Sequence, residues 1–176
     1  MKRRSLIALP VLFAAGRAGA QAAYPSKPIH IVVSVSAGGS IDMIARSYGE
    51  ALSQSVGQPV VIENRPGANG NIAAAAVARA APDGYTLLAT GGSTLNLNPF
   101  LYRELPFDPQ KSFTPVTLTA RTNFILVVHP KLGVDSLEAF VALAKAKPRT
   151  LNYGSAGSGS LIQIATELFN ATAGIE

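Results

Sequence analysis

The stretch from Pro28 to Leu52 constrains the fold most strongly, because it joins an apolar, β-branched segment to a helical pattern through two consecutive glycines. Residues 29–35 have the composition of a buried strand. Apolar residues then recur at helical spacing after Ser40, which we expect to be the N-cap of a helix. Gly38 and Gly39 allow backbone angles and close approaches that a Cβ would forbid. The stretch therefore predicts a strand, a glycine loop and a helix.

The glycine loop also suggests a chemical role. Unpaired amides at the start of a helix favour an anion above the end of the strand, so the pattern predicts a recess of carboxylate size. A plain strand-to-helix turn that needs backbone freedom has the same pattern, and both interpretations stay open. Asp42 lies in the first turn of the helix, where a carboxylate commonly stabilises the dipole. It could also order the glycine loop or accept a hydrogen bond from a ligand.

The alternation of strand and helix continues along the chain. Residues 60–63 predict a second strand, residues 71–81 an alanine-rich helix, and residues 85–90 a third strand. This order indicates a parallel α/β sheet with right-handed crossovers. A loop of glycine and hydroxyl residues, 91–94, follows the third strand as the glycine loop follows the first. Both loops should share the carboxyl edge of one sheet, where ligands bind in such folds.

The second part of the chain predicts further elements and a third loop of the same kind. Residues 116–119 and 124–129 are predicted as strands, and Ser136 is predicted to cap an amphipathic helix. Residues 151–160 are interpreted as another strand-end loop, followed by a helix over 161–169. The amides and serine hydroxyls of this loop could donate hydrogen bonds to the oxygens of a carboxylate. A flexible linker is the alternative for this loop.

The first 22 residues have the three parts of an export signal. They comprise a basic start, an apolar run from Leu6 to Ala15, and small residues up to Ala22, after which we expect cleavage, with Ala20 as the other site. The apolar run is too short for a hydrocarbon layer of roughly 30 Å. Arg3 and Arg4 also permit a twin-arginine route. We therefore expect an exported, soluble mature protein.

Composition and missing motifs exclude several functions. The leader carries four of the 15 basic residues and no acidic residue, so the rest of the chain has 11 basic and 10 acidic residues. This near balance, without a basic run, argues against binding to nucleic acid. There are no cysteines for disulfides or thiolates. The glycine loops lack the spacing of nucleotide motifs, and no serine lies in G-x-S-x-G. His30 and His129 are expected to be structural. The sequence thus predicts no enzyme, cofactor or metal site.

Several blocks in order resemble the periplasmic solute-binding receptors of tripartite tricarboxylate transporters, often called the Bug family. The matching blocks cover the chain from Tyr24 to its last residue. They are YPSKPIHIVV, SAGGSIDMIAR, ENRPGANGNIAAAAVARAAPDGYTLL, NPFLYRELPFDPQKSFTPV and AKAKPRTLNYGSAGSGS.

The resemblance implies a periplasmic-binding-protein-like α/β fold of Venus-flytrap type, which closes on a small organic carboxylate. It implies a signal peptide at 1–22, a first α/β domain at 23–120 and an incomplete second α/β domain at 121–176. It also implies a monomer that delivers its ligand to the membrane subunits of the transporter. The ligand-binding residues carried over from the family lie on the three loops. They are Ser36, Ala37, Gly38, Gly39, Asp42, Gly91, Ser93, Ser155, Ala156, Gly157 and Ser158.

Two departures from the family pattern affect these expectations. Many relatives have a histidine where this chain has Gln163, so the role of that side chain is open. The family is nearly twice this long, so we expect the 176-residue chain to bind its ligand weakly or not at all. An exported carboxylate-processing enzyme and a ligand-sensing receptor are the alternative functions. The sequence leaves the identity of the carboxylate open.

Overall fold

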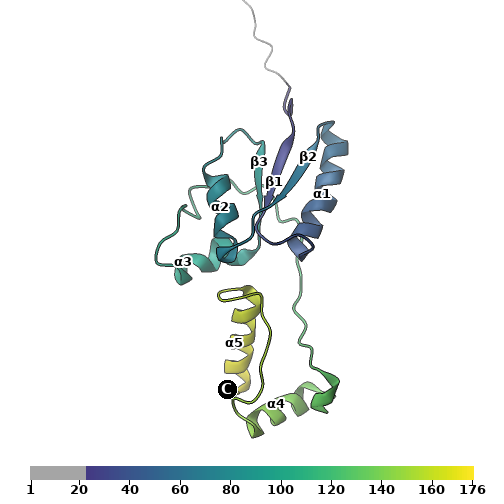
Figure 1. The fold of residues 1–176 in the computed structure, drawn as a ribbon, viewed down its shortest axis with the longest axis vertical. Coiled ribbons are helices and arrows are strands. Elements are labelled where there is room, and N and C mark those ends of the chain that lie inside the picture. The colour runs from purple at the N-terminus through teal and green to yellow at the C-terminus, as the bar shows by residue number, and fades with distance from the viewer. Residues whose placement is uncertain (1–22) are drawn as a thin grey trace, which may run out of the picture.

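The computed structural model describes residues 23–176, so the predicted export signal lies outside the described residues. The elements are shown in Figure 1. In chain order they are β1 (Ile29–Val33), α1 (Ser40–Val56), β2 (Val60–Asn64), η1 (Ala68–Gly70), α2 (Asn71–Ala78), β3 (Thr86–Ala89), η2 (Ser93–Leu97), α3 (Asn98–Leu101), η3 (Pro130–Leu132), α4 (Leu137–Ala146) and α5 (Leu161–Ala173).

The three strands form a parallel sheet in the order β2-β1-β3. Ile31 in the central strand lies opposite Ile62 on one side and Leu87 on the other. Helices α1 and α2 flank the sheet (Figure 1). Val33 is fully buried and packs with Ala45 of α1 in the main core. The predicted parallel α/β sheet is confirmed, with its second and third strands where the sequence placed them.

Small residues bring both helices close to the sheet. Gly49 of α1 is buried, and a Cβ there would lie 3.0 Å from Cδ1 of Ile62. Ala73, Ala74 and Ala75 of α2 are likewise buried. This close approach leaves the carboxyl ends of the strands and the loops that follow them as the open edge of the sheet.

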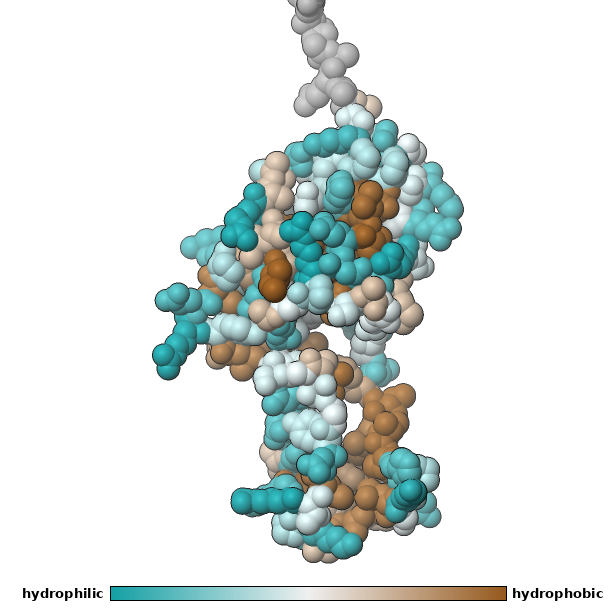
Figure 2. All heavy atoms as spheres, viewed as in Figure 1, coloured by the Kyte–Doolittle hydropathy of each residue, from teal (hydrophilic) through white to brown (hydrophobic). Residues whose placement is uncertain are grey.

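The strands predicted at residues 116–119 and 124–129 are absent, and that prediction was wrong. These segments have no strand partner within residues 23–176. Ile125 and Val127 have exposed fractions of 82% and 81%, and Figure 2 shows brown, hydrophobic spheres beside the helical part of the molecule. Apolar composition gives strand propensity, but a strand forms only where a neighbour can pair with its backbone. The strand-end character predicted for the loop at residues 151–160 is missing for the same reason, because no described strand leads into it.

Helices α4 and α5 form a helical unit beyond the carboxyl ends of the strands (Figure 1). Ser136 caps α4 as predicted, because its Oγ accepts a hydrogen bond from the amide of Ala139 at 3.1 Å. The rings of Phe140 and Phe169 stack between the two helices at a centroid distance of 6.3 Å. The proposed domain boundary at residue 120 stays a prediction. Over residues 23–176, the structure contains no helix with the length and apolar character needed to span a membrane.

Candidate functional site

Three loops meet on one side of the sheet, and they are the loops that the sequence singled out. They follow β1, follow β3 and precede α5 (Figure 1). A Cβ on Gly91 would lie 3.3 Å from Ile41, which places the first two loops side by side. A Cβ on Gly92 would lie 3.9 Å from Leu161, which places the third loop beside the second. The arrangement is the one expected of a site shared by three loops, while the assignment of ligand-binding residues stays a prediction.

The start of α1 differs from the prediction in its cap. Gly39, not Ser40, is the N-cap, and no cap side chain bonds to the helix amides. Instead Asp42, in the first turn, reaches back so that Oδ2 accepts a hydrogen bond from the amide of Gly38 at 2.8 Å. Gly38 has φ +83°, a conformation that favours glycine. The carboxylate of Asp42 therefore fixes the shape of the glycine loop.

Asp42 is only 2% exposed and has two further partners. Nε of Arg46 donates to Oδ2 at 3.0 Å, and Nδ2 of Asn64 donates to Oδ1 at 2.8 Å. The hydrogen bond from Arg46, followed by those from Gly38 and Asn64, lowers the pKa of Asp42 to about 2. Both carboxylate oxygens are thus occupied by the chain, which favours the loop-ordering role of Asp42 over direct contact with a ligand.

The amides of the first loop divide into two groups. Gly38 donates to Asp42, and Gly39 donates to the carbonyl of Ser36 at 3.2 Å. These two residues, predicted as amide donors to the ligand, therefore shape the loop. By contrast, several amides in this loop and in the first turn of α1 have no acceptor within the described part of the chain. They include the amides of Ser36, Ala37, Ser40 and Ile41.

The second loop is shorter than predicted, because a helical turn begins at Ser93. Gly91 and Ser93 are half-buried, and Thr94 is buried. The hydroxyl of Thr94 donates to the carbonyl of Asn69 at 3.0 Å and pairs with Thr90 at 2.7 Å. The prediction of a loop over residues 91–94 was therefore wrong from Ser93 onward.

The third loop is the most exposed of the three. Ser155, Ala156, Gly157 and Ser158 are all exposed. The amide of Gly157 donates to Oγ of Ser155 at 3.2 Å. Oε1 of Gln163 accepts a hydrogen bond from the amide of Gly159 at 2.6 Å. Gln163 therefore holds the end of this loop against α5, a role that the sequence had left open.

Sequence reasoning missed a cluster of polar side chains behind the loops, which we call the asparagine cluster. Nδ2 of Asn98 donates to Oδ1 of Asn71 at 2.6 Å and to the carbonyl of Asn69 at 3.0 Å. Nδ2 of Asn69 donates to Oδ1 of Asn98 at 2.6 Å. Asn98 is fully buried. The cluster comprises Asn69, Asn71, Thr94 and Asn98. Its members come from separate segments that only the fold brings together. The sequence indicated only that Asn69 lies among turn-forming residues, and it did not predict the cluster.

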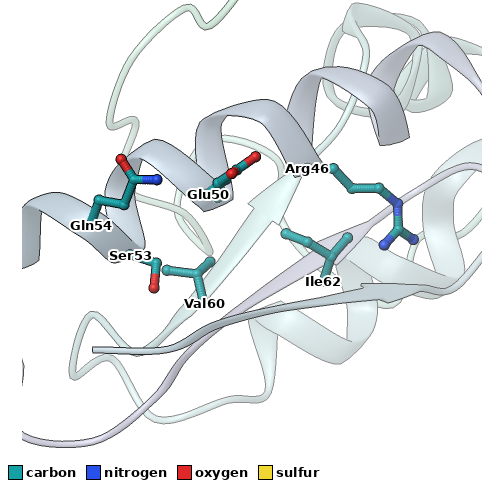
Figure 3. Close-up of a pocket in the computed structure, with 7 residues that line it drawn as sticks. Arg46, Glu50, Ser53, Gln54, Val60 and Ile62 are labelled. Carbon is teal, nitrogen blue, oxygen red and sulfur yellow. The ribbon is translucent and has the colours of Figure 1, made fainter. Parts of the chain in front are cut away.

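A groove of about 370 Å³ lies away from the loops, between α1 and β2. Figure 3 shows Glu50, Ser53 and Gln54 along one side of it, and Val60 and Ile62 on the strand opposite. Among its lining residues, Arg46 belongs to the Asp42 network. The groove contains none of the predicted ligand-binding residues. The described residues also hold no group of three His, Cys, Asp or Glu side chains that could bind a metal ion.

Replacement of Asp42 tests its anchoring role through pH. The pKa of Asp42 is lower in the folded chain than in the unfolded chain, so its contribution to stability is present above pH ~4 and is lost as the pH falls towards 2. We expect Asp42→Asn to lower the melting temperature near neutral pH and to flatten its fall in acid. Circular dichroism melts over a series from neutral pH down to about pH 2 measure both effects.

The matched control for this prediction is Asp83→Asn. Asp83 also has a lowered pKa, chiefly from its hydrogen bond with Lys27, but both side chains of that pair are substantially exposed. Exposed ion pairs contribute little to stability, so this variant should melt close to the parent protein. Melting temperatures of Asp42→Asn that coincide with those of the parent at every pH would show that the anchor is unimportant.

Comparison with known proteins gives consistent matches. The family model described as "Tripartite tricarboxylate transporter family receptor" matches residues 44–176. A UPF0065 protein of Bordetella bronchiseptica is 41% identical over 97% of this chain and 51% of that protein. Protein BugT of Bordetella pertussis is 39% identical over 86% of this chain and 47% of that protein.

Solved structures agree with these matches. "R. palustris Rpa4515 with adipate" has a TM-score of 0.83 and 38% identity, over 87% of this chain and 51% of that one. MatC of Rhodopseudomonas palustris with bound malate has a TM-score of 0.71 and 31% identity, over 87% and 52%. The chain thus spans about half the length of the relatives it matches. The predicted periplasmic-binding-protein-like fold is confirmed, and the chain belongs to the tripartite tricarboxylate transporter receptor family.

Proposed function

We propose that this protein captures a small organic carboxylate outside the cytoplasm and delivers it to the membrane subunits of a tripartite tricarboxylate transporter. In this proposal the protein is an exported, monomeric receptor that makes and breaks no covalent bond and needs no cofactor. One observation carries the proposal: the uncommitted amides of Ser36, Ala37, Ser40 and Ile41 lie together at the positive end of α1. The other two loops lie on the same side of the sheet as this end of α1 (Figure 1).

The chemistry of these loops suits a carboxylate better than a bulkier or cationic ligand. An ionised carboxylate has two oxygens with about four acceptor sites, and it gains most from several N–H donors held in place beforehand. Asp42 provides this preparation, because it fixes the loop while its charge is balanced by Arg46. Seryl hydroxyls of the third loop, at Ser155 and Ser158, would donate from the opposite side. The adipate and malate bound to related proteins support the same ligand class.

Capture would couple to delivery through a shift between open and closed arrangements of two domains. We propose the first domain at residues 23–120 and the start of the second at 121–176. A ligand that contacts loops of both parts stabilises the arrangement in which the loops are close. The 176-residue chain spans about half of its relatives, so we expect it to hold a ligand weakly through the loops it has.

Nuclear magnetic resonance of the ¹⁵N-labelled 176-residue chain tests the proposal at the weak affinity expected. Titration with adipate should shift the amide signals of Ser36, Ala37, Ser40 and Ile41 in a saturable manner. The signals of Gly57, at the opposite end of α1, and of Gly133, which ends η3, should stay unchanged. The control titration uses 1,6-hexanediol, which has the same carbon chain and no carboxylate. Absent loop shifts, or equal shifts with the diol, would refute carboxylate binding at this edge. Tight calorimetric binding would refute the expected weakness.

A further inference from the structure

Within residues 23–176, the helical unit is tied to the sheet unit near the loops by one side-chain hydrogen bond. Nδ2 of Asn69 donates to the carbonyl of Gly159 at 2.9 Å, across 90 residues of sequence. The neighbouring Ser160 is 6% exposed and Gly159 is half-buried, although residues 151–158 are open to solvent. The connecting chain is a second tie, which Tyr48 holds by donating to the carbonyl of Thr119 at 2.7 Å. Leu161 also lies beside Gly92 at the same junction. The contact at Asn69 therefore fixes the free end of the helical unit.

The backbone at Asn69 is held in an unusual conformation. Ala68, Asn69 and Gly70 have φ values of +47°, +53° and +89°, three consecutive left-handed residues of which two carry a Cβ. Such a conformation persists only where surrounding structure enforces it. The asparagine cluster supplies this enforcement, because Thr94 and Asn98 both donate to the carbonyl of Asn69. The buried cluster thus aims one side chain, that of Asn69, at the third loop.

The backbone at Gly159, whose carbonyl accepts this hydrogen bond, is also adapted to the contact. Gly159 has φ +77°, and a Cβ there would lie 2.8 Å from Cδ1 of Leu101 and 3.4 Å from Nδ2 of Asn69. A side chain at residue 159 would have to displace the end of Leu101, would crowd Nδ2 of Asn69 and would adopt a backbone conformation that favours glycine. By contrast, Gly157, two residues earlier, has φ +102° and nothing within 4 Å of an added Cβ. The fit is therefore specific to the position that meets Asn69.

We propose that Asn69 is a positioning residue, and that its hydrogen bond to Gly159 is a latch that sets how the third loop is placed against the first two. The asparagine cluster holds one half of the latch, and the glycine at 159 forms the other. Its purpose rests on the proposed function, since a carboxylate shared by three loops needs the third loop at a fixed distance. The latch itself requires no ligand and is tested without one.

The test uses the absence of cysteine from the sequence. Ser47→Cys on α1 and Ala142→Cys on α4, both exposed positions, carry spin labels, and pulsed electron resonance measures the distance between the units. Asn69→Gly removes the side chain and keeps the left-handed backbone. We expect about a fivefold larger population of separated units, the factor for one hydrogen bond of typical net strength. The control is Ala68→Gly, which has the same backbone conformation and no side-chain bond to lose.

A second pair of variants tests the latch from the other side. Gly159→Ala should separate the units. Gly157→Ala, which also places an alanine at a positive φ but meets no neighbouring atom, should not. Circular dichroism melts report whether each variant is folded, and the distances are compared only below its transition. The proposal is overturned if Asn69→Gly keeps the parental distance distribution, or if it broadens no more than Ala68→Gly. Because no ligand is present, this outcome is independent of whether adipate binds.

Discussion

Gly70→Ala should be among the most damaging single substitutions in the described part of the protein. Gly70 is buried, has φ +89° and lies directly against Thr94, so that an added Cβ would overlap the hydroxyl of that residue and lie 3.2 Å from Cβ of Ser34. The left-handed conformation costs an alanine about 1–2 kcal/mol, and overpacking a buried site costs about 1–3 kcal/mol more. We therefore expect a loss of about 2–5 kcal/mol, the sum of these two costs, measured by urea denaturation.

Gly57→Ala separates the two causes of this loss. Gly57 ends α1 with φ +67°, and an added Cβ would meet nothing within 4 Å. This control should lose only the conformational cost of about 1–2 kcal/mol. The difference between the two variants then measures the contact with Thr94. Equal losses of stability in the two variants would mean that Thr94 and Ser34 move aside easily. The asparagine cluster would then be less rigid than its burial indicates.

The contrast between these glycines shows what the sequence could predict. The unit from β1 to α1 was predicted well, because its signals are local: a β-branched run, paired glycines and a helical spacing that begins at residue 40. The repetition of that unit also predicted a parallel sheet and the edge where the loops gather. A glycine that ends a helix and one that accommodates Thr94 look alike in the sequence. Only the packing distinguishes them.

Features that depend on distant partners were predicted poorly. Residues 124–129 have strand composition, yet no described strand pairs with them. Asp42 was recognised as a first-turn acid, but its bond to Asn64 joins residues 22 positions apart. That contact could have been anticipated only from the place of Asn64 at the carboxyl end of the neighbouring strand. The asparagine cluster had no comparable signal, because it joins residues 27 and 29 positions apart across loops.

Asn98→Asp should be similarly severe, for an electrostatic reason. Asn98 is fully buried, and its Nδ2 donates to two acceptors, the carbonyl of Asn69 and Oδ1 of Asn71. The substitution keeps the shape of the side chain but turns this donor into an oxygen that faces two oxygens. A buried charge without a partner costs about 3–5 kcal/mol, so we expect a loss of that size near neutral pH. Chemical denaturation of the variant and the parent measures it.

The pH dependence of Asn98→Asp distinguishes a buried charge from simple misfitting. Burial and the facing oxygens raise the pKa of the introduced carboxyl in the folded state above its unfolded value of about 4. The folded state then binds the proton more readily, so the deficit relative to the parent should be largest above that raised pKa and should shrink as the pH falls to about 4. Asn96→Asp, at an exposed position in the same segment, should change stability by no more than about 0.5 kcal/mol at any pH. A deficit for Asn98→Asp that does not vary with pH would indicate simple misfitting of the new side chain, and the buried-charge explanation would then be wrong.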